Sequence, residues 1–285
     1  MKNLLRTLVY NGQVSLTLAD TTALVAEGKR LHGLSNFSAY LFGKALSVMT
    51  FMSACLKENS GEISLSIKTS GDGGEIAVSG NRALNMRGYI ENTQLSENPN
   101  EEAERRAFAE NGSVTVIRND GYSRPFVGAC AFPDAGGLDE AFAEYFRISE
   151  QIPTRIATTV KTDAAGKIVF AGVAVLQPLP FADAETLEKT RAADLSLLLC
   201  EMERIGAEAT ATKYFEKDER VWEMREAQYQ CNCSREYLTR VLISLGEAQM
   251  REIIREDGAV RVHCHYCNTD YTFDGRDADE LFIRK

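Results

Sequence analysis

The sequence predicts an α+β fold followed by a small cysteine-rich module. Strand-like and helix-like runs are interspersed and separated by hairpin signals, and they do not alternate strictly as in a doubly wound sheet. Four of the seven cysteines fall in two close pairs near the C-terminus. We therefore expect an N-terminal α+β core domain over residues 1–181, a helical linker over 182–230 and a compact C-terminal module over 231–285.

The first half of the core domain contains two alternating runs, Val14–Leu18 (VSLTL) and Ile63–Lys68 (ISLSIK), which predict strands. Between them, Ser38–Leu56 is rich in Ala, Leu, Met and Phe and has no helix breaker, so it predicts a mostly buried helix. Ser70–Gly74 (SGDGG) predicts a turn, and Glu75–Ser79 predicts the strand after it. A phosphate-binding loop is not indicated, because no G-K-[ST] follows and the next element is a strand.

The second half of the core domain continues this mixed pattern. Ser113–Arg118 predicts a strand that leads into a hairpin signal at Asn119–Gly121. A helix should begin at Leu138, because apolar residues then recur at helical spacing. Lys167–Gln177 predicts a buried strand that Pro178 ends.

The predicted linker differs in composition from the core domain. Residues 182–230 hold twelve acidic and seven basic residues and no proline. Leu187–Ile205 and Tyr214–Gln228 predict helices separated by a weak stretch at 206–212. Because these helices are highly charged and modest in apolar content, they depend on packing against neighbours.

Composition and charge exclude several classes of protein. The net charge of −9 argues against broad binding of nucleic acid, which needs a basic surface. The longest apolar segment, Leu41–Leu56, contains Lys44 and is shorter than a membrane span, and the N-terminus does not resemble a signal peptide. We expect a cytoplasmic protein that binds neither nucleic acid nor membrane. In that compartment clustered cysteines are metal-binding or redox-active more often than structural disulfides.

The C-terminal module has a readable local structure. Ser234 is a helix N-cap candidate, and the apolar residues that follow predict one helix ending at Gly246 and a second ending at Asp257. Val260–His263 and Tyr271–Phe273 predict a hairpin whose corner carries the second cysteine pair. That shape is typical of a zinc knuckle.

The two cysteine pairs are C-x-C at Cys231 and Cys233 and C-x-x-C at Cys264 and Cys267. Four thiolates brought together in a tetrahedron form a closed, structural Zn²⁺ site, with one ion for each chain. His263 and His265 flank Cys264, but four thiols already close the site, so we expect both to be solvated. The other cysteines, Cys55, Cys130 and Cys200, stand in apolar surroundings and are predicted to be buried in the core.

Three functions are compatible with these thiols. A passive zinc site is one, a catalytic thiol–disulfide oxidoreductase is another, and a redox switch that uses both states is the third. A module of this size is marginal without a metal or disulfide, so an oxidant that consumes the thiolates would remove the fold together with the ion. A disulfide within C-x-C would be strained and easily reversed, which suits a sensor.

Two rival functions have specific weaknesses. A thioredoxin-type C-x-x-C should open a helix after a strand, whereas here it occupies a predicted hairpin corner. A zinc-ribbon nucleic-acid binder should carry a basic aromatic strip, which the sequence lacks. No Ser/His/Asp set is present, and we do not expect an enzyme.

Several further motifs are spread along the chain. They are C-N-C-S at 231–234, C-H-Y-C-N at 264–268 with Tyr271 and Phe273, MRGY at 86–89, YFRISEQIP at 145–153 and AVLQPLP at 174–180. With these motifs the sequence resembles, over essentially the whole chain, the thirty-three-kilodalton heat-shock protein family of redox-regulated bacterial holdase chaperones. Tyr229 and Gln230 depart mildly from the family pattern, and this departure bears on the folding energetics of the linker.

The resemblance implies a specific mechanism. In the reduced state the four cysteines bind zinc and the protein has little activity. Oxidants together with unfolding conditions convert them to two disulfides, Cys231–Cys233 and Cys264–Cys267, and release the ion. The metastable linker then unfolds, and exposed surface captures unfolded or oxidatively damaged client proteins without ATP. Activated members of the family form homodimers.

Overall fold

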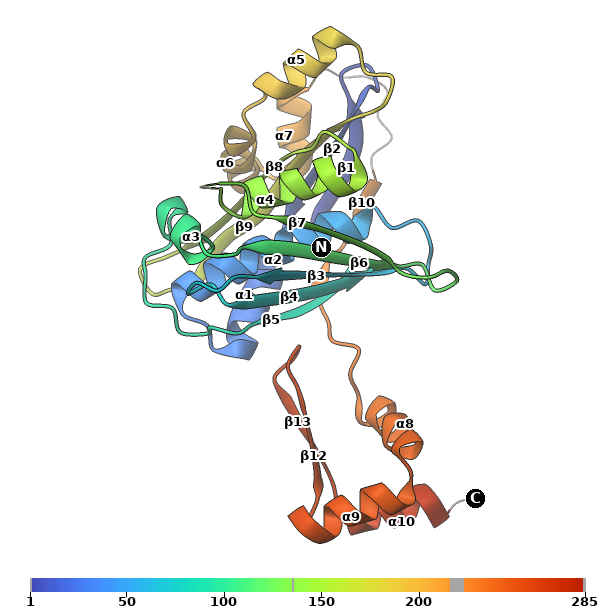
Figure 1. The fold of residues 1–285 in the computed structure, drawn as a ribbon. Helices are drawn as coiled ribbons and strands as arrows, with labels where there is room; N and C mark the ends of the chain where they lie inside the picture. Colours follow the sequence, from blue (N-terminus) through green and yellow to red (C-terminus); the bar gives the residue numbers. More distant parts are fainter. Residues whose placement is uncertain (1, 135, 216–222, 284–285) are drawn as a thin grey trace. The chain divides into compact units, whose positions relative to one another are not determined.

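The computed structural model describes residues 2–134, 136–215 and 223–283 of the chain, which forms two compact units, 1–230 and 231–285. The first unit contains two β-sheets with helices between and around them (Figure 1). The predicted α+β class is confirmed. No helix among the described residues has both the length and the apolar character needed to cross a bilayer.

The first sheet of the N-terminal unit, sheet A, is antiparallel throughout. Its β2–β9 and β8–β9 pairs are the longest, and the second includes an irregularity at Lys161 and Thr162. The order across sheet A is β10 (Glu223–Arg225), β1 (Leu4–Val9), β2 (Val14–Asp20), β9 (Ile168–Pro178) and β8 (Arg155–Thr162).

The second sheet, sheet B, is antiparallel except at one edge, where β11 lies parallel to β5. The strands predicted at 63–68, 75–79 and 113–118 are its β3, β4 and β6. The order across sheet B is β11 (Gln228–Tyr229), β5 (Asn85–Ile90), β4 (Glu75–Asn81), β3 (Glu62–Lys68), β6 (Ser113–Asn119) and β7 (Phe126–Ala131).

Helix α2 (Asn36–Ala54) is the centre of this unit and confirms the buried helix predicted over 38–56. It contacts strands of both sheets, and all of its residues from Phe37 onward except Tyr40 are buried. Small residues allow this close approach: a Cβ added at Gly43 would lie 2.7 Å from Val25 of α1 (Thr22–His32) and 2.8 Å from Val160 of β8. Because α2 meets protein on every side, it is apolar on every side.

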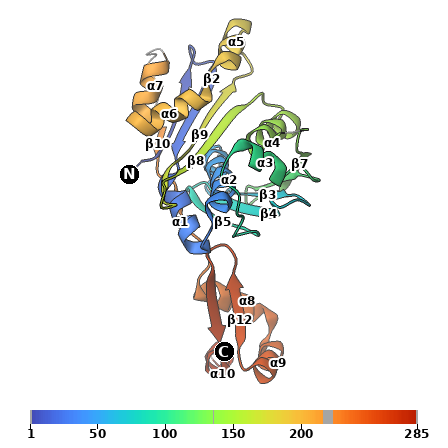
Figure 2. The same cartoon turned by 90° about the vertical axis from the view of Figure 1, so that its left-hand side faces the viewer.

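The remaining helices of the unit cover the outer surfaces. Figure 2 shows α6 and α7 on one side of β2 and β9, with α2 on the other side. Helix α6 packs on β8 and β9, and its apolar stripe completes a second core cluster with residues of β1, β2 and β9. These helices are α3 (Glu101–Ala107), α4 (Leu138–Tyr145) with the π-helical turn Phe146–Glu150, α5 (Ala184–Ala192), α6 (Leu195–Ile205) and α7 (Ala207–Tyr214).

The predicted linker helices need two corrections. The helix expected over 187–205 is two helices, because the chain becomes extended at Ala193 and Asp194 caps α6 by accepting a hydrogen bond from the Leu197 N–H. The second helix, expected over 214–228, is also wrong: helix α7 covers most of the stretch expected to separate the two helices and ends at Tyr214, whereas 223–225 and 228–229 are strands and 216–222 lie outside the described residues. Two open sheet edges give this segment hydrogen-bond partners that a local pattern cannot reveal.

The prediction that three cysteines are buried in the core is correct for Cys130 only. Cys55 is partly buried and Cys200 is exposed. Helix α6 buries Leu198, Leu199 and Met202, and Cys200 falls on the opposite, solvent-facing side of this amphipathic helix.

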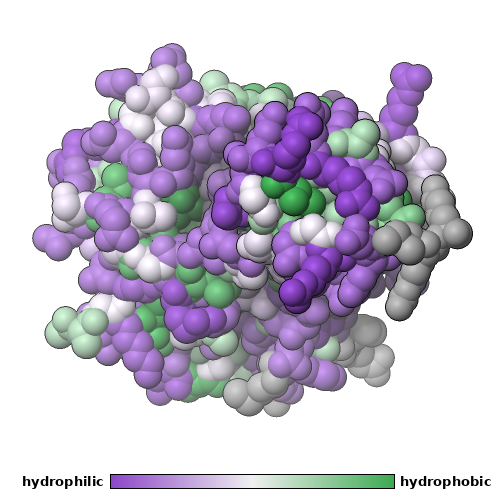
Figure 3. All heavy atoms as spheres, turned by 90° about the horizontal axis from the view of Figure 1, so that it is seen from below, coloured by the Kyte–Doolittle hydropathy of each residue, from purple (hydrophilic) through white to green (hydrophobic). Residues whose placement is uncertain are grey.

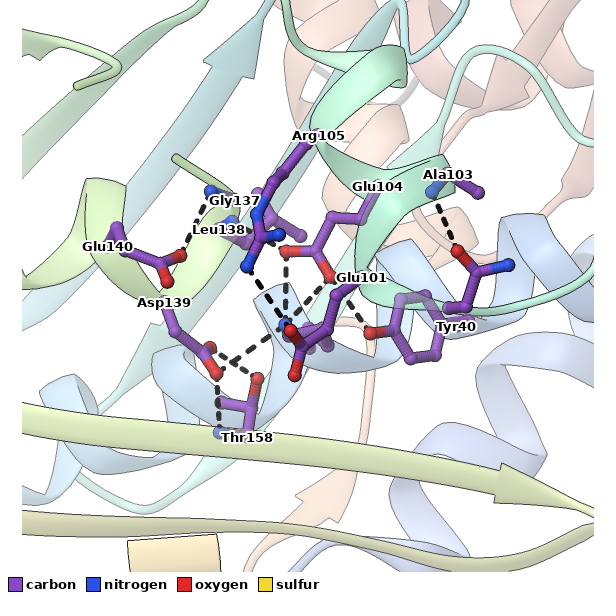
Figure 4. A network of polar contacts seen from close by, with 12 residues as sticks. Tyr40, Glu101, Ala103, Glu104, Arg105, Gly137, Leu138, Asp139, Glu140 and Thr158 are labelled. Carbon is purple, nitrogen blue, oxygen red and sulfur yellow. Dashed lines mark hydrogen bonds and ion pairs between the residues drawn. The ribbon is translucent and has the colours of Figure 1, made fainter. Parts of the chain in front are cut away.

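Lys44, in the middle of α2, belongs to a buried ionic cluster that the sequence did not predict. Its Nζ lies 2.8 Å from Oε2 of Glu104 and 3.5 Å from Oδ2 of Asp139. Burial acts to lower the pKa of Lys44, but the two carboxylates outweigh it and raise the pKa above its ordinary value. Figure 4 shows how Glu104 and Asp139 converge from α3 and α4, with Asp139 also accepting hydrogen bonds from Thr158.

The C-terminal unit has a much smaller core of its own. Helix α8 begins after Ser234, whose Oγ accepts a hydrogen bond from the Tyr237 N–H at 3.1 Å, as the predicted N-cap requires. The buried residues are Leu242, Met250, Ala259, Val260, Phe273 and Ala278. The elements are α8 (Arg235–Leu245), α9 (Glu247–Asp257), β12 (Val260–Cys264), β13 (Thr269–Phe273) and α10 (Gly275–Ile283).

Candidate metal centre

The four cysteines of the C-terminal unit come together at one point. Cys231 and Cys233 lie on the extended segment before α8, Cys264 ends β12, and Cys267 lies in the turn before β13. Their four sulfur atoms are all within 4.8 Å of one another. Among the described residues this is the group of His, Cys, Asp and Glu side chains placed to hold a metal ion.

The turn between β12 and β13 places the C-x-x-C pair. The N–H groups of Cys267 and Asn268 both donate to the carbonyl oxygen of Cys264, at 3.3 and 2.8 Å. Asn268 has a φ of 53°, in the left-handed region that asparagine tolerates better than most residues. Both sulfur atoms of the pair therefore point to the same side of a tight hairpin corner, as predicted.

The sulfur separations are too long for disulfides; the Cys231–Cys264 separation matches two thiolates on one metal ion, and the Cys233–Cys267 separation is shorter than that. Sγ of Cys231 is 3.7 Å from Sγ of Cys264, and Sγ of Cys233 is 3.1 Å from Sγ of Cys267. Two thiolates on one tetrahedral Zn²⁺ with Zn–S bonds near 2.3 Å lie about 3.8 Å apart. A disulfide needs about 2.05 Å, and all seven cysteines are free.

The electrostatics of the cluster favour a cation at its centre. Burial raises the pKa of Cys267 to about 11 and also raises the pKa of Cys231. Burial acts in the same direction on Cys233, but hydrogen bonds from Tyr271 and from neighbouring thiols outweigh it and lower that pKa. Four thiolates this close repel one another, so a bound divalent ion is what would hold all of them deprotonated together.

Tyr271 contacts the centre directly, a contact that the sequence did not predict. Its hydroxyl oxygen lies 3.3 Å from Sγ of Cys233, and a phenol at this distance donates a hydrogen bond to a thiolate. Cys233 and Tyr271 are 38 residues apart. The hairpin alternation could have shown that Tyr271 lies on the same ribbon as Cys267, but not that it reaches the other pair.

The two histidines beside Cys264 are exposed. Nδ1 of His263 lies 2.8 Å from Oδ1 of Asp270 on the opposite strand, and the His263 and His265 rings meet edge to face with centroids 4.9 Å apart. Neither belongs to the group of clustered ligand atoms. The candidate ligand set is the predicted one: Cys231, Cys233, Cys264 and Cys267.

A mixed α+β unit followed by a small module built on four clustered cysteines defines a two-unit protein with a thiol cluster that could hold a metal ion. A profile described as Hsp33 protein matches residues 2–274. The 33 kDa chaperonins of Bacillus cytotoxicus and of Bacillus cereus strain AH187 are each 32% identical over 287 residues, covering 98% of this chain and 97% of the relative.

A solved structure supports the same assignment at the level of the fold. The crystal structure of the 33 kDa chaperonin (heat shock protein 33 homolog) from Thermotoga maritima matches with a TM-score of 0.82 at 23% sequence identity, covering 99% of this chain and 98% of the other. The chain belongs to the Hsp33 family. The family resemblance found in the sequence is confirmed.

Proposed function

We propose that this protein is a redox-regulated, ATP-independent holdase chaperone, switched by oxidation of the four-cysteine centre. The observation that carries the proposal is the cluster of four free cysteines, with all sulfur atoms within 4.8 Å, in a module whose apolar core is small. The relatives' name, 33 kDa chaperonin, supports a chaperone function.

The ion proposed for this centre is Zn²⁺. Cys231, Cys233, Cys264 and Cys267 would supply four soft thiolate donors with no open position, which suits structural zinc rather than a hydrolytic centre. When bound, the ion supplies the positive charge that keeps the four sulfur atoms deprotonated and close. The chain's own contribution is to place them, through the hairpin turn at Cys264 and the N-capped start of α8.

Oxidation would remove this set of donors. In each pair two thiolates lose two electrons and form one S–S bond, while one hydrogen peroxide takes up those electrons and two protons and leaves as two waters. The proposed pairs are Cys231–Cys233 and Cys264–Cys267. In the structure the short sulfur contacts join one cysteine of each pair to the other pair, so both pairs must rearrange as the disulfides form.

The segment 182–230 would transmit the change. Helix α5 buries only two of its residues, Thr186 and Thr190, which is little packing for a helix of this length. We propose that this metastable linker unfolds when the module loses its ion, that the newly exposed surface captures unfolded or oxidatively damaged client proteins, and that the activated protein forms a homodimer in the cytoplasm.

The scattered hydrophobic residues on one face of the molecule support the proposal that the client-binding surface is covered in the resting protein. On the face drawn in Figure 3, hydrophobic residues occupy small areas separated by hydrophilic ones. A holdase needs a larger apolar surface than such scattered residues provide. Activation by uncovering surface would supply it.

The test compares reduced and peroxide-treated protein in one assay. Light scattering by chemically unfolded citrate synthase reports aggregation, and a chromogenic chelator reports released zinc. We expect the reduced protein to release no zinc and to leave scattering high, and the oxidised protein to release one zinc per chain and suppress scattering without ATP. Zinc release with unchanged scattering would contradict the chaperone assignment.

The thiol–disulfide oxidoreductase alternative is tested in parallel. The C-x-x-C pair lies in a β-turn rather than at the start of a helix, which is unfavourable for a thioredoxin-type nucleophile. Reduction of insulin by dithiothreitol should therefore proceed at the uncatalysed rate when this protein is added. Rapid turnover would favour the alternative.

A further inference from the structure

Residues 223–230, directly before Cys231, close one edge of each sheet in the N-terminal unit. Strand β10 pairs with β1 at the edge of sheet A, and β11 pairs with β5 at the edge of sheet B. An unpaired sheet edge is a ready template for another extended chain, so native proteins cover it. Here the cover is a segment that ends at the first cysteine of the metal centre.

Strand β11 is held by few backbone contacts. The N–H groups of Gln228 and Gln230 donate to the carbonyl oxygens of Leu84 and Met86, at 3.0 and 2.8 Å. Just before the strand, the side chain of Asn3 exchanges two hydrogen bonds with the backbone of Ala227. A parallel pairing of two residues is much shorter than an ordinary strand, so its release needs little free energy.

The side chain of Tyr229 makes the most specific contacts of this segment. Its hydroxyl donates to the carbonyl oxygen of Gly88 at 2.8 Å and accepts from the Gly88 N–H at 3.2 Å. Nε2 of His32 lies 3.1 Å from the same oxygen. The phenol therefore satisfies both edge-facing backbone groups of a β5 residue.

The ring of Tyr229 lies against Gly28 of α1. A Cβ added at Gly28 would lie 3.3 Å from the Tyr229 ring and 2.8 Å from Phe42. The absence of a side chain at Gly28 therefore leaves a slot beside Phe42 that admits one aromatic ring.

We propose that the β5 edge and this slot form a client-binding site, and that β11 is its occupant in the resting protein. A client segment in extended conformation would add to β5 as β11 does, with an aromatic side chain in place of Tyr229. Backbone hydrogen bonds would give affinity without sequence demands, and the slot would select the aromatic residue. The inference rests on the holdase function proposed above.

The kind of client segment that would bind at the β5 edge follows from β11, which occupies that edge in the resting protein. Unfolded chains of any sequence offer backbone N–H and C=O groups, and apolar aromatic residues are those that unfolding exposes. The direct connection of β11 to Cys231 explains why this edge would open when the metal centre is lost. The switch and the binding site then share one segment.

The decisive experiment places a photo-crosslinker on the edge. The variant Asn85→p-benzoylphenylalanine carries it on β5 opposite Gln228, and Val127→p-benzoylphenylalanine carries it on β7, at the other edge of the same sheet. We expect client adducts with chemically unfolded citrate synthase at position 85 after oxidation and not before, and few adducts at position 127.

The outcomes separate this inference from the proposed function. If the oxidised protein suppresses aggregation but forms no client adduct at position 85, or equal adducts at both positions, the edge site is wrong while the holdase function stands. If the oxidised protein does not suppress aggregation at all, the proposed function itself fails.

A second experiment empties the slot while the thiols stay reduced. We expect reduced, zinc-loaded Tyr229→Ala to suppress aggregation with full zinc content, because loss of the ring shifts the edge toward its open form. Tyr229→Phe keeps the ring but loses the hydroxyl contacts with Gly88 and His32. It should show a weaker effect than Tyr229→Ala, with the open population raised roughly fivefold for each hydrogen bond lost.

The matched control is Tyr89→Ala, which removes a tyrosine from β5 on the face opposite to Gly88. This variant should stay inactive when reduced. Equal activation by Tyr229→Ala and Tyr89→Ala would mean general loosening and would overturn the inference.

Discussion

The two units of the chain are stabilised in different ways. The N-terminal unit surrounds α2 with two sheets and buries several large aromatic residues, including Phe37, Phe42 and Phe51, at 2% exposure or less. The C-terminal unit buries only six of its described residues, with Phe273 as its single fully buried aromatic residue among them. The comparison teaches that apolar burial can hold the first unit, whereas a core as small as that of the second usually needs a metal or a disulfide as well.

Removal of the metal should have the largest effect, and it should destabilise the second unit without destabilising the first. A strong chelator, or the variant Cys264→Ser, removes a contribution of roughly 10–16 kcal/mol of apparent binding free energy, which exceeds the net stability of a module this small. Hydrogen exchange should show full loss of protection over 231–285, while the backbone amides of α2 stay protected. Equal loss of protection in both units would contradict the division.

Loss of the buried lysine should have the next largest effect, and it should destabilise the first unit. Replacing Lys44 by alanine leaves Glu104 and Asp139 buried without their cation and should lower the free energy of unfolding by about 3–5 kcal/mol. Denaturant titration of the zinc-loaded protein measures this. The exposed Arg105→Ala variant, which loses only the surface pair with Glu101, should change it by less than about 1 kcal/mol.

The Lys44→Ala effect should also depend on pH. Burial already raises the pKa of Asp139, and loss of Lys44 removes a charge that opposes this rise. A carboxyl whose folded pKa is raised binds its proton more tightly in the folded state, so its folding contribution is favourable at low pH and is lost as pH rises through that pKa. The destabilisation should therefore be smallest in acid and grow toward neutral pH.

The hydrogen bond from Tyr271 to Cys233 gives a smaller effect, confined to the second unit. Tyr271→Phe removes a donor to a thiolate, which contributes about 1.5–3 kcal/mol, and leaves the ring in place. We expect weaker zinc retention against a competing chelator and faster zinc release by peroxide, since the sulfur becomes a better nucleophile. Tyr237→Phe, on the exposed part of α8, is the control and should behave as the wild type.

The smallest predicted effect concerns a helix N-cap, and each unit has a serine in this role. Ser35 caps α2 by accepting the Ser38 N–H, and Ser234 caps α8 by accepting the Tyr237 N–H, each at 3.1 Å. Loss of the cap should cost about 1 kcal/mol at either position, and Ser35→Ala also loses the hydrogen bond that Ser35 donates to the Leu95 carbonyl oxygen at 2.7 Å. Because we expect the second unit to have the smaller free energy of unfolding, Ser234→Ala should raise local hydrogen exchange in α8 more than Ser35→Ala does in α2.

The sequence pattern predicted those helices and strands that are determined by residues close to one another in the chain. The apolar run of α2, the alternation of β3 and β6, and the Ser234 cap could all be read from neighbouring residues. The four clustered cysteines followed from spacing and residue type. The strands at 223–229 could not be predicted, because their partners β1 and β5 lie more than 130 residues earlier in the chain.

Long-range contacts also explain the other features that the sequence did not reveal. A lysine in an apolar helix was visible, but its partners Glu104 and Asp139 come from two separate helices. Tyr229 stood out as a departure from the family pattern, and its reason is the pair of edge groups on Gly88. Exposure of Cys200 depends on which face of α6 meets sheet A, and flanking apolar residues do not specify that.

The position of β10 and β11 in the chain has a consequence for synthesis on the ribosome. Strands begun at Leu4 and Asn85 acquire their edge partners only when residues 223–229 have been made. Throughout most of translation the nascent N-terminal unit therefore carries two uncovered edges, and the residues that cover them emerge just ahead of Cys231. Both sheets are thus closed before Cys264 and Cys267, the second half of the cysteine cluster, have been synthesised.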